Sequence, residues 1–521
     1  MKRMRLFGML LAGMMLVTLP ANADKKQTKP TPQQLAADSL AKLTERADPK
    51  GKNDDKAQNT LGVWYYTGNN VKQDYARALK YWALAAKQNN PDAIGNMAMC
   101  YQQGKGIQKD SLKAAELYKK AIGKGNTSIL KQLTELADNQ NDLFSSLLLH
   151  ELYSKGISVN RDQVKGQQYL KKAAAIGHTD SQLQWALLCL NDKNPKEAAT
   201  WFKKAADKGN LSSIYYYGYL LFKGMGVTQN KAEGINYLKQ ASKRGLTAAD
   251  NMLGPIYYEG NGTEKDIDLA LKHLKKAATA KMGDSQFTLG QCYKNGEGVE
   301  KDYHLAVQWL AEAYRHQKAD DVKELIESGT DENFKSYIDG LKKLYVDKDF
   351  ENATKLFKKV EKAGIIDGLT MQALCLADAN NPKKNERKAF KMLKEAASGS
   401  AAAQYQLAKC YEEGIGTEKN TDTARDLILQ AAEKGDGNAL STAGDLYFEG
   451  KGVAQDYVKA VQYYLQAEAL SKLTASSAQN LIKCYNMSIS NLPDLNKKEE
   501  RIKTLNKISS ADNVLAMLKK L

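Results

Sequence analysis

The sequence predicts an all-α solenoid built from about eleven helix-hairpin repeats. A run of small, apolar and aromatic residues recurs in the same order along the chain. Equivalent loop glycines such as Gly260 and Gly296 lie 36 residues apart. Each run leads through a Gly-x-Gly loop into a second amphipathic run. A fixed period of this length is typical of stacked hairpins, which bury their apolar faces only against neighbouring copies.

The first helix of each repeat is predicted from its apolar spacing. In the copy that begins at Ala249, the residues Leu253, Gly254 and Tyr257 follow at helical spacing and share one face. The glycine beside the leucine leaves room for a neighbouring helix. The Gly-x-Gly loop then supplies the backbone freedom that ends the helix.

The second helix is predicted from an N-cap residue followed by apolar residues one turn apart. Ala270, Leu274 and Ala277 form this stripe in the same copy. Asp and Asn are favoured caps because their side chains accept a hydrogen bond from the first helical turn. The predicted caps are Asp110, Asp162, Asp266, Asp302 and Asp456, with Asn230 and Asn420 at equivalent positions.

These core, turn and cap residues resemble the Sel-one-like repeat family, which is related to the tetratricopeptide repeats. The resemblance covers most of the chain after its first residues. It implies a right-handed α/α superhelical solenoid whose first helices line a concave binding face. Family members generally act as adaptors and scaffolds for other proteins, and bacterial members are often exported to the cell envelope.

Residues 1–23 are predicted to be an export signal. Lys2, Arg3 and Arg5 precede an apolar run from Leu6 to Leu19, and a small-residue cleavage site follows. The apolar run is short for a membrane span. We therefore expect a periplasmic or secreted protein of the bacterial cell envelope that is not transmembrane after removal of the signal. An uncleaved anchor is the alternative.

Breakers and changes in regularity predict the rest of the organisation. A helix-patterned insertion at 127–142 interrupts the array. The predicted parts are a polar tether with one short helix at 24–56, a first block of repeats at 57–319, a degenerate repeat or hinge at 320–367, a second block at 368–473 and C-terminal capping helices at 474–521.

Charge and cysteine content limit the partners and the chemistry. The formal net charge is +16. The excess of Lys is consistent with a solvated outer face of the solenoid. The alternative is that the positive charge attracts anionic partners such as acidic proteins or cell-envelope polymers. Nucleic acid is not expected, because Arg-rich clusters and known binding modules are missing. The six cysteines recur singly in the repeats, so we expect reduced, buried thiols that act as small apolar residues.

No catalytic residue, cofactor or metal site is predicted, and the protein is not expected to be an enzyme. The Gly-x-Gly loops lack the third glycine of a dinucleotide fingerprint, and the histidines lack metal-ligand spacing. Ser39 with Lys42 and Ser128 with Lys131 match Ser-x-x-Lys. The Lys-Thr-Gly strand that a β-lactamase-like site requires is absent from the sequence.

Aromatic residues nine, five and two positions before the loop glycine are predicted to face the groove and bind a partner. Aromatic side chains are enriched in binding hot spots. The alternative is that these rings pack against the first helix of the next repeat. The predicted groove residues are Tyr66, Tyr215, Tyr219, Phe222, Tyr258, Phe287, Tyr405 and Phe448.

The sequence therefore favours an exported, non-enzymatic scaffold or adaptor that holds a protein or peptide in its concave groove. One alternative is a peptidoglycan or glycan binder, for which groove tyrosines and Trp185 would act as stacking platforms. The other is an envelope hydrolase of β-lactamase-like activity, which would use one of the two Ser-x-x-Lys matches.

Overall fold

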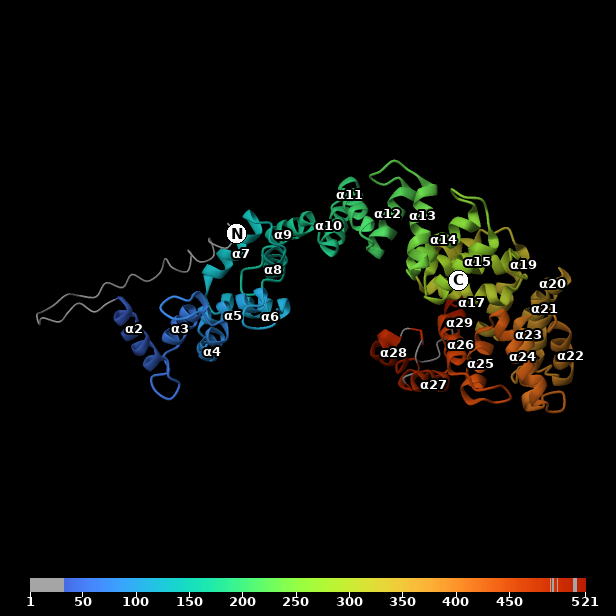
Figure 1. Cartoon of the computed structure of the whole chain (residues 1–521). Helices are drawn as coiled ribbons and strands as arrows, with labels where there is room; N and C mark the ends of the chain where they lie inside the picture. The colour runs from blue at the N-terminus through green and yellow to red at the C-terminus, as the bar shows by residue number, and fades with distance from the viewer. Residues whose placement is uncertain (1–31, 488, 490–491, 494, 509–512) are drawn as a thin grey trace, which may run out of the picture. The chain divides into compact units, whose positions relative to one another are not determined.

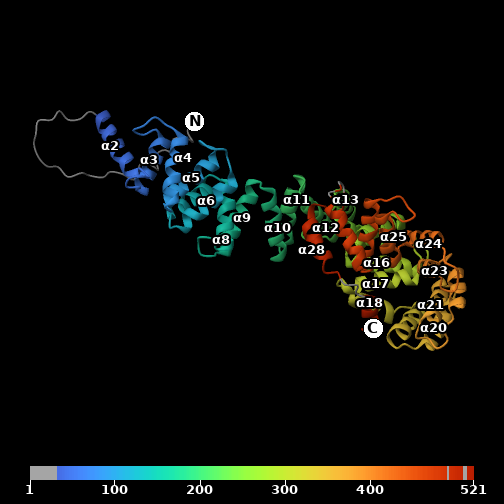
Figure 2. The ribbon, with the colours of Figure 1, turned by 90° about the horizontal axis from the view of Figure 1, so that it is seen from below.

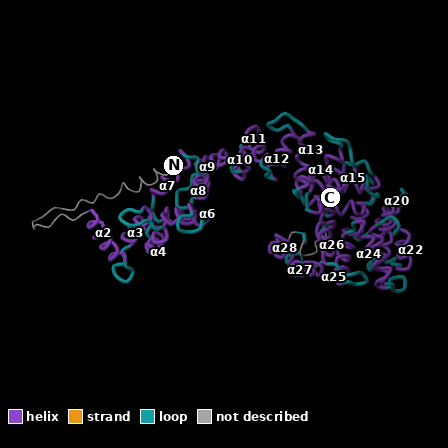
Figure 3. Tube along the Cα trace, in the orientation of Figure 1, coloured by secondary structure: helices purple, strands orange, loops and turns teal. Residues whose placement is uncertain are grey.

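A computed structural model describes residues 32–487, 489, 492–493, 495–508 and 513–521. Within these residues the chain consists of helices joined by loops and turns (Figure 3). The chain divides into two compact units, residues 1–210 and residues 211–521. The predicted export signal at 1–23 lies outside the described residues.

The first unit contains helices α2 to α11 (Figure 1). Their bounds are α2 Pro32–Ala47, α3 Asp55–Thr67, α4 Tyr75–Lys87, α5 Pro91–Gln103, α6 Ser111–Gly123, α7 Thr127–Asn139, α8 Leu143–Lys155, α9 Gln163–Ile176, α10 Thr179–Asn191 and α11 Pro195–Asp207.

The second unit begins with α12 and extends to the C-terminus. Its helices are α12 Leu211–Lys223, α13 Lys231–Lys243, α14 Thr247–Glu259, α15 Ile267–Thr279, α16 Gly283–Asn295, α17 Tyr303–Arg315, α18 Ala319–Glu327, α19 Glu332–Leu341, the π-helix η3 Lys342–Val346, α20 Phe350–Lys362, α21 Ile366–Ala377, α22 Glu386–Ala396, α23 Ala401–Glu413, α24 Thr421–Lys434, α25 Gly437–Glu449, α26 Tyr457–Ala469, α27 Ala475–Asn486, the 3₁₀ helix η4 Leu495–Lys497, α28 Lys498–Leu505 and α29 Asn513–Leu518.

Helix pairs stack in chain order within each unit. In the first unit α3 packs against α4, and α4 packs against α5. In the second unit α14, α15 and α16 repeat the pattern. This arrangement confirms the all-α solenoid of hairpin repeats. The insertion at 127–142 forms α7, which packs between α6 and α8.

The predicted caps and loop glycines shape each hairpin. The Asp266 carboxylate accepts a hydrogen bond from Leu269 N at 2.9 Å and begins α15. Gly104 ends α5 with a φ of 72°. In the same loop Gly106 has a φ of 71°, and a Cβ there would lie 2.6 Å from Tyr75 Cβ. Left-handed backbone and the lack of space together require glycine at this second loop position.

Glycines within the helices allow close packing of the two helices of a hairpin, as the sequence predicts. A Cβ on Gly254 would lie 2.6 Å from Leu274 Cδ2. At Gly218 the obstacles include backbone: a Cβ would lie 3.0 Å from Gly234 O and 2.8 Å from Tyr237 Cβ. The helices α12 and α13 therefore meet through two facing glycines.

Two helical segments follow α18 in the region at 320–367, which the sequence predicts to be a degenerate repeat or hinge. The first is α19 with the π-helix η3, and the second is α20. Phe334, Tyr337 and Phe357 are buried at their contact, and the Tyr337 and Phe357 ring centroids lie 5.8 Å apart. The segments continue the stack, because α19 packs against α20 and α20 against α21.

The second unit closes on itself, because helices distant in sequence meet. Helix α26 contacts α15, and α29 contacts α17. Figures 1 and 2 both place the C-terminus beside α17. Lys281 Nζ lies 2.9 Å from the Glu468 carboxylate, and Arg501 also pairs with Glu468. Burial raises the pKa of Glu468, but these two cations outweigh it and hold the pKa below its ordinary value.

Candidate binding surface

A cavity of about 210 Å³ lies on the inner side of the second unit. Its apolar wall comes from Val307 of α17, Met371 and Leu374 of α21, Ala402 of α23 and Leu515 of α29. Helices α21, α23 and α25 are the first helices of their hairpins. First helices thus supply part of the wall of this cavity, and α17, η3 and α29 contribute the rest.

One end of the cavity is polar. His304 Nε2 lies 3.4 Å from Asp436 Oδ2 and 2.8 Å from Gln308 Nε2. Gly437 N donates to Gln308 Oε1 at 3.3 Å, and Asp436 Oδ1 accepts from Ala439 N at 2.8 Å. These groups hold α17 and α25 together. These bonds within the chain fix the positions of the polar groups, and a few fixed polar groups beside an apolar wall can orient a ligand.

Two buried carboxyl groups lie at the N-terminus of α17, beside this polar end. Asp302 caps the helix by accepting from Leu305 N at 2.7 Å. Asp367 Oδ2 accepts from Tyr303 N at 2.6 Å, and its other oxygen accepts from Ser400 Oγ at 3.1 Å. Burial raises the pKa of both groups, and the Asp367 charge raises the pKa of Asp302 further. Burial and the proximity of the two groups favour the protonated form of one member of the pair.

The predicted groove residues Tyr66 and Tyr258 lie between successive repeats. The Tyr66 hydroxyl donates to Gln103 Oε1 at 3.2 Å, and the Tyr258 hydroxyl donates to Glu297 Oε1 at 3.1 Å. Lys105 also donates to the Tyr66 oxygen at 3.0 Å. Each ring thus contacts the repeat that follows it, which is the packing role that the sequence left open as the alternative.

The other predicted groove residues are buried or half-buried. Phe222 is 4% exposed, so it offers almost no surface to a partner in this structure. Tyr405 lies within hydrogen-bonding reach of Thr442 in the next first helix. The ring of Phe448 lies 5.5 Å from that of Tyr457. Tyr215, Tyr219 and Phe287 are half-buried. A partner-binding role for this set stays a prediction.

The structure places other positions at the cavity. Ala402 and Gln406 lie twelve and eight residues before Gly414, and Asn438 lies twelve before Gly450. None of the predicted aromatic residues lines this cavity. The signal was present in the sequence as small and polar residues four positions apart on a helix. Such residues are common on helices in general, so this pattern alone does not distinguish a binding surface from an ordinary helix face.

Lysines cover many of the half-buried aromatic rings. Lys105 Nζ lies 5.0 Å from the Tyr66 ring centroid, and Lys171 Nζ lies 4.9 Å from that of Trp185. Trp185 also donates to Glu197 Oε1 at 3.1 Å. Such cation–π contacts occupy the ring faces that a sugar would stack on. Trp185 is therefore a poor open platform in this conformation.

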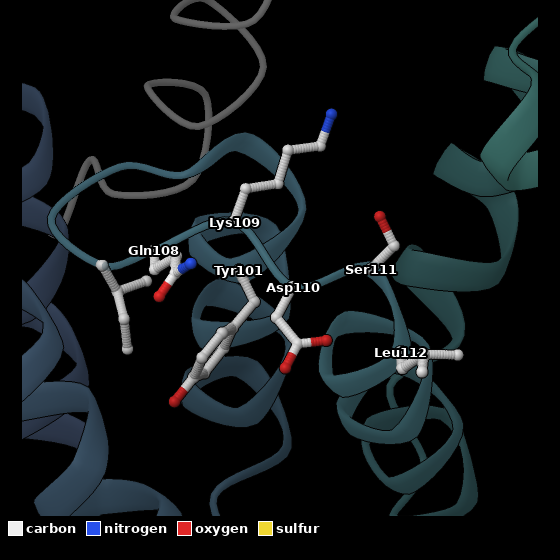
Figure 4. A pocket seen from close by; sticks show the side chains of 7 residues that line it. Tyr101, Gln108, Lys109, Asp110, Ser111 and Leu112 are labelled. Carbon is white, nitrogen blue, oxygen red and sulfur yellow. The ribbon is translucent and has the colours of Figure 1, made fainter. Parts of the chain in front are cut away.

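A second hollow, on the surface, lies at the loop between α5 and α6 (Figure 4). Its lining includes Tyr101, Lys109, Asp110, Ser111 and Leu112. Asp110 is committed to capping α6, since it accepts from Lys113 N at 2.8 Å. The hollow belongs to the same Gly-x-Gly loop that recurs in other repeats.

The histidines and the Ser-x-x-Lys residues take structural positions. His273 Nδ1 lies 2.7 Å from Asp250 Oδ1, and its ring stacks on Tyr257. His178 caps α10. Ser39 and Ser128 are exposed on the separate helices α2 and α7. Among the described residues, no group of His, Cys, Asp or Glu is arranged to hold a metal ion.

A profile of the Sel1 repeat matches ten stretches that together cover more than half of the chain. They are residues 55–90, 91–126, 145–178, 182–210, 211–246, 247–281, 283–317, 373–400, 401–436 and 439–471. The chain belongs to the Sel1 repeat family. The matches explain the shared loops and caps of its hairpins. Sel1 repeat proteins generally act as protein-interaction scaffolds.

Individual relatives of this Sel1 repeat protein are distant. It is similar to the DAP3-binding cell death enhancer 1 of Rattus norvegicus, with 25% identity over 217 residues, 37% of this chain. That match spans 40% of the length of the rat protein.

Two solved structures are also similar to this Sel1 repeat protein. One is a protective antigen of uropathogenic Escherichia coli strains that displays an SLR fold, at 23% identity, with 92% of this chain and 97% of that chain covered and a TM-score of 0.36. The other is a Sel1 repeat protein from Oxalobacter formigenes, at 18% identity, with 82% and 97% covered and a TM-score of 0.32.

Proposed function

We propose that this Sel1 repeat protein is an exported, non-enzymatic scaffold that holds a protein or peptide partner on the inner face of its repeats. The observation that carries the proposal is the partly apolar cavity in the second unit. First helices supply Met371, Leu374 and Ala402 to it, and Gln406 and Asn438 provide polar contacts. Apolar surface with a few polar groups is suited to binding a peptide side chain.

Export is the part of the proposal that rests on sequence. Lys2, Arg3 and Arg5, the apolar run and the small residues near Ala23 form a secretory signal pattern. In the described part of the chain, no helix combines the length and apolar character that a membrane span requires. The proposed location is the periplasm or the outside of a bacterial cell. Cleavage can be tested by N-terminal sequencing of the mature protein, with Asp24 expected as the first residue.

The groove assignment can be tested by affinity capture from a cell-envelope extract followed by titration of the purified partner. The test variant is Tyr215→Ala/Tyr219→Ala. The control is Tyr447→Ala/Tyr463→Ala, which removes a ring pair stacked at 5.7 Å within one hairpin. The first variant is expected to weaken partner binding at least tenfold while the control retains it. Equal binding by both variants would remove the predicted tyrosines from the interface.

The same capture separates the protein partner from the glycan alternative. A protein partner is expected to remain bound after glycan digestion of the extract, whereas a glycan ligand is lost. The net positive charge supports acidic partners, so capture is expected to weaken with added salt. A hydrolase is tested by replacing Ser39 and Ser128 with Ala, which the scaffold proposal expects to change no activity.

A further inference from the structure

The C-terminal helix of the chain lies on the inner side of the second unit. Helix α29 packs against α17 and the π-helix η3. Its side chains Met517 and Leu518 are each 1% exposed. At its first residue, the Asn513 amide donates to Glu312 Oε1 at 2.6 Å, and Glu312 itself is buried. The chain's own end thus occupies part of the surface that a partner would use.

This contact is small and depends on few groups. Helix α29 has six residues, and isolated helices shorter than about 12–15 residues are marginal in water. Its helical conformation therefore depends on packing against α17 and η3. The attachment includes two buried apolar side chains and one hydrogen bond to a buried carboxylate. Such a short segment can be exchanged for another that offers the same groups.

The cavity continues the same surface beyond α29. Val514 and Leu515, which are half-buried, line it together with residues of α21 and α23. At its margin η3 presents Tyr345, which is 39% exposed, and Val346, which is 37% exposed. π-Helical turns occur frequently at functional sites. Apolar surface is thus available on both sides of the helix that already lies there.

We infer that this inner surface of the second unit is a docking site for an apolar helical segment of a partner protein, and that α29 occupies it in cis until that segment displaces it. The inference deepens the proposed scaffold function and rests on it. The partner segment places aliphatic side chains against α17 and the cavity, and a hydrogen-bond donor against Glu312. A helix laid in an apolar groove is a recurrent mode of peptide recognition.

The site binds its partner less tightly while α29 is docked. The apparent affinity falls in proportion to the fraction of molecules whose site is free. A change that releases α29 without altering the groove is therefore expected to strengthen binding. This expectation distinguishes a displaceable helix from one that only completes the fold.

The test uses the full-length chain and a fluorescent peptide of residues 513–521 as the probe. Leu518→Asp places a charge at a buried position and releases α29. Ala516→Asp adds the same charge at an exposed position of the same helix and is the matched control. Anisotropy titration is expected to show about tenfold tighter peptide binding by Leu518→Asp than by the native chain or the control. Equal binding by all three, or no binding by a folded Leu518→Asp variant, overturns the inference.

A second variant decides the question if Leu518→Asp fails to fold. Asn513→Ala removes the hydrogen bond to Glu312 and keeps the apolar contacts, so a rise of several-fold in peptide affinity is expected and an unchanged affinity contradicts the inference. Partner capture by the native chain is measured separately from binding of the peptide probe. Failure of peptide binding with capture intact therefore removes only the docking site, whereas absence of any captured protein partner removes the scaffold function.

Discussion

The close approach of α12 and α13 makes Gly218→Ala an informative perturbation. The added Cβ would lie 2.8 Å from Tyr237 Cβ and 3.0 Å from Gly234 O. Carbon atoms prefer a separation of about 3.5–4.0 Å, so the helices must separate by several tenths of an ångström. Overpacking of this kind costs about 1–3 kcal/mol. Replacing a helical glycine by alanine recovers about 1 kcal/mol. The middle of that range of costs, about 2 kcal/mol, less this gain leaves a net destabilisation of about 1 kcal/mol.

Hydrogen exchange of the α12 and α13 amides, together with urea unfolding, measures this effect. Exchange is needed because a chain with two compact units need not unfold in a single step. Gly51→Ala is the control, since its Cβ would come no closer than 3.6 Å to Asp48 Cβ, an ordinary van der Waals contact. Exchange from α12 is expected to accelerate about fivefold in Gly218→Ala and to change little in the control. Unchanged or slower exchange in Gly218→Ala would refute the requirement for close approach.

Three further predictions follow from the hydrogen bonds and burial. The folded-state pKa of Asp302 is raised, so its contribution to stability is present at acidic pH and is lost as pH rises through that pKa. Asp302→Asn, which keeps the cap, is expected to raise the free energy of unfolding by about 1–2 kcal/mol at pH 8 and little at pH 4. A larger gain at pH 4 than at pH 8 in urea titrations contradicts this. Burial raises the pKa of Cys100 and Cys292 to about 12. A thiol reagent is therefore expected to label these two cysteines only when the protein unfolds. Rapid labelling of the native protein would count against reduced, buried cysteines. Asn126 caps α7 and donates to Asp92 Oδ1 of the preceding repeat at 2.7 Å. Asn126→Ala is therefore expected to lower the free energy of unfolding by about 1–2 kcal/mol and to speed hydrogen exchange in the first turn of α7. Unaltered exchange would argue that the cap is dispensable.

Much of the fold could be predicted because each repeat carries its local instructions. Asp266 as a cap, Gly104 at a helix end and Gly254 at a close contact each act within one hairpin. Their recurrence at a fixed period then implies stacking. The closure of the second unit could not be predicted in this way. Glu312 and Asn513 meet across 201 residues, and no period relates them.

The binding surface was harder to predict than the fold. Aromatic residues such as Tyr66 and Tyr258 suggested a groove, but the structure uses their hydroxyls between repeats. The cavity is lined instead by residues such as Ala402 and Gln406, whose side chains carry little compositional signal. The contribution of α29 depends on where the chain returns in space. Tertiary closure, rather than local pattern, decides which faces remain available.

Photo-crosslinking tests the central claim, that a protein partner binds the inner face of the repeats, most directly. A photoreactive amino acid at Gln406 places the probe at the cavity, and the same residue at Lys391, exposed on the second helix α22, provides the control. The scaffold account predicts a crosslinked partner from position 406 and none from position 391. Crosslinking from position 391 alone would contradict it.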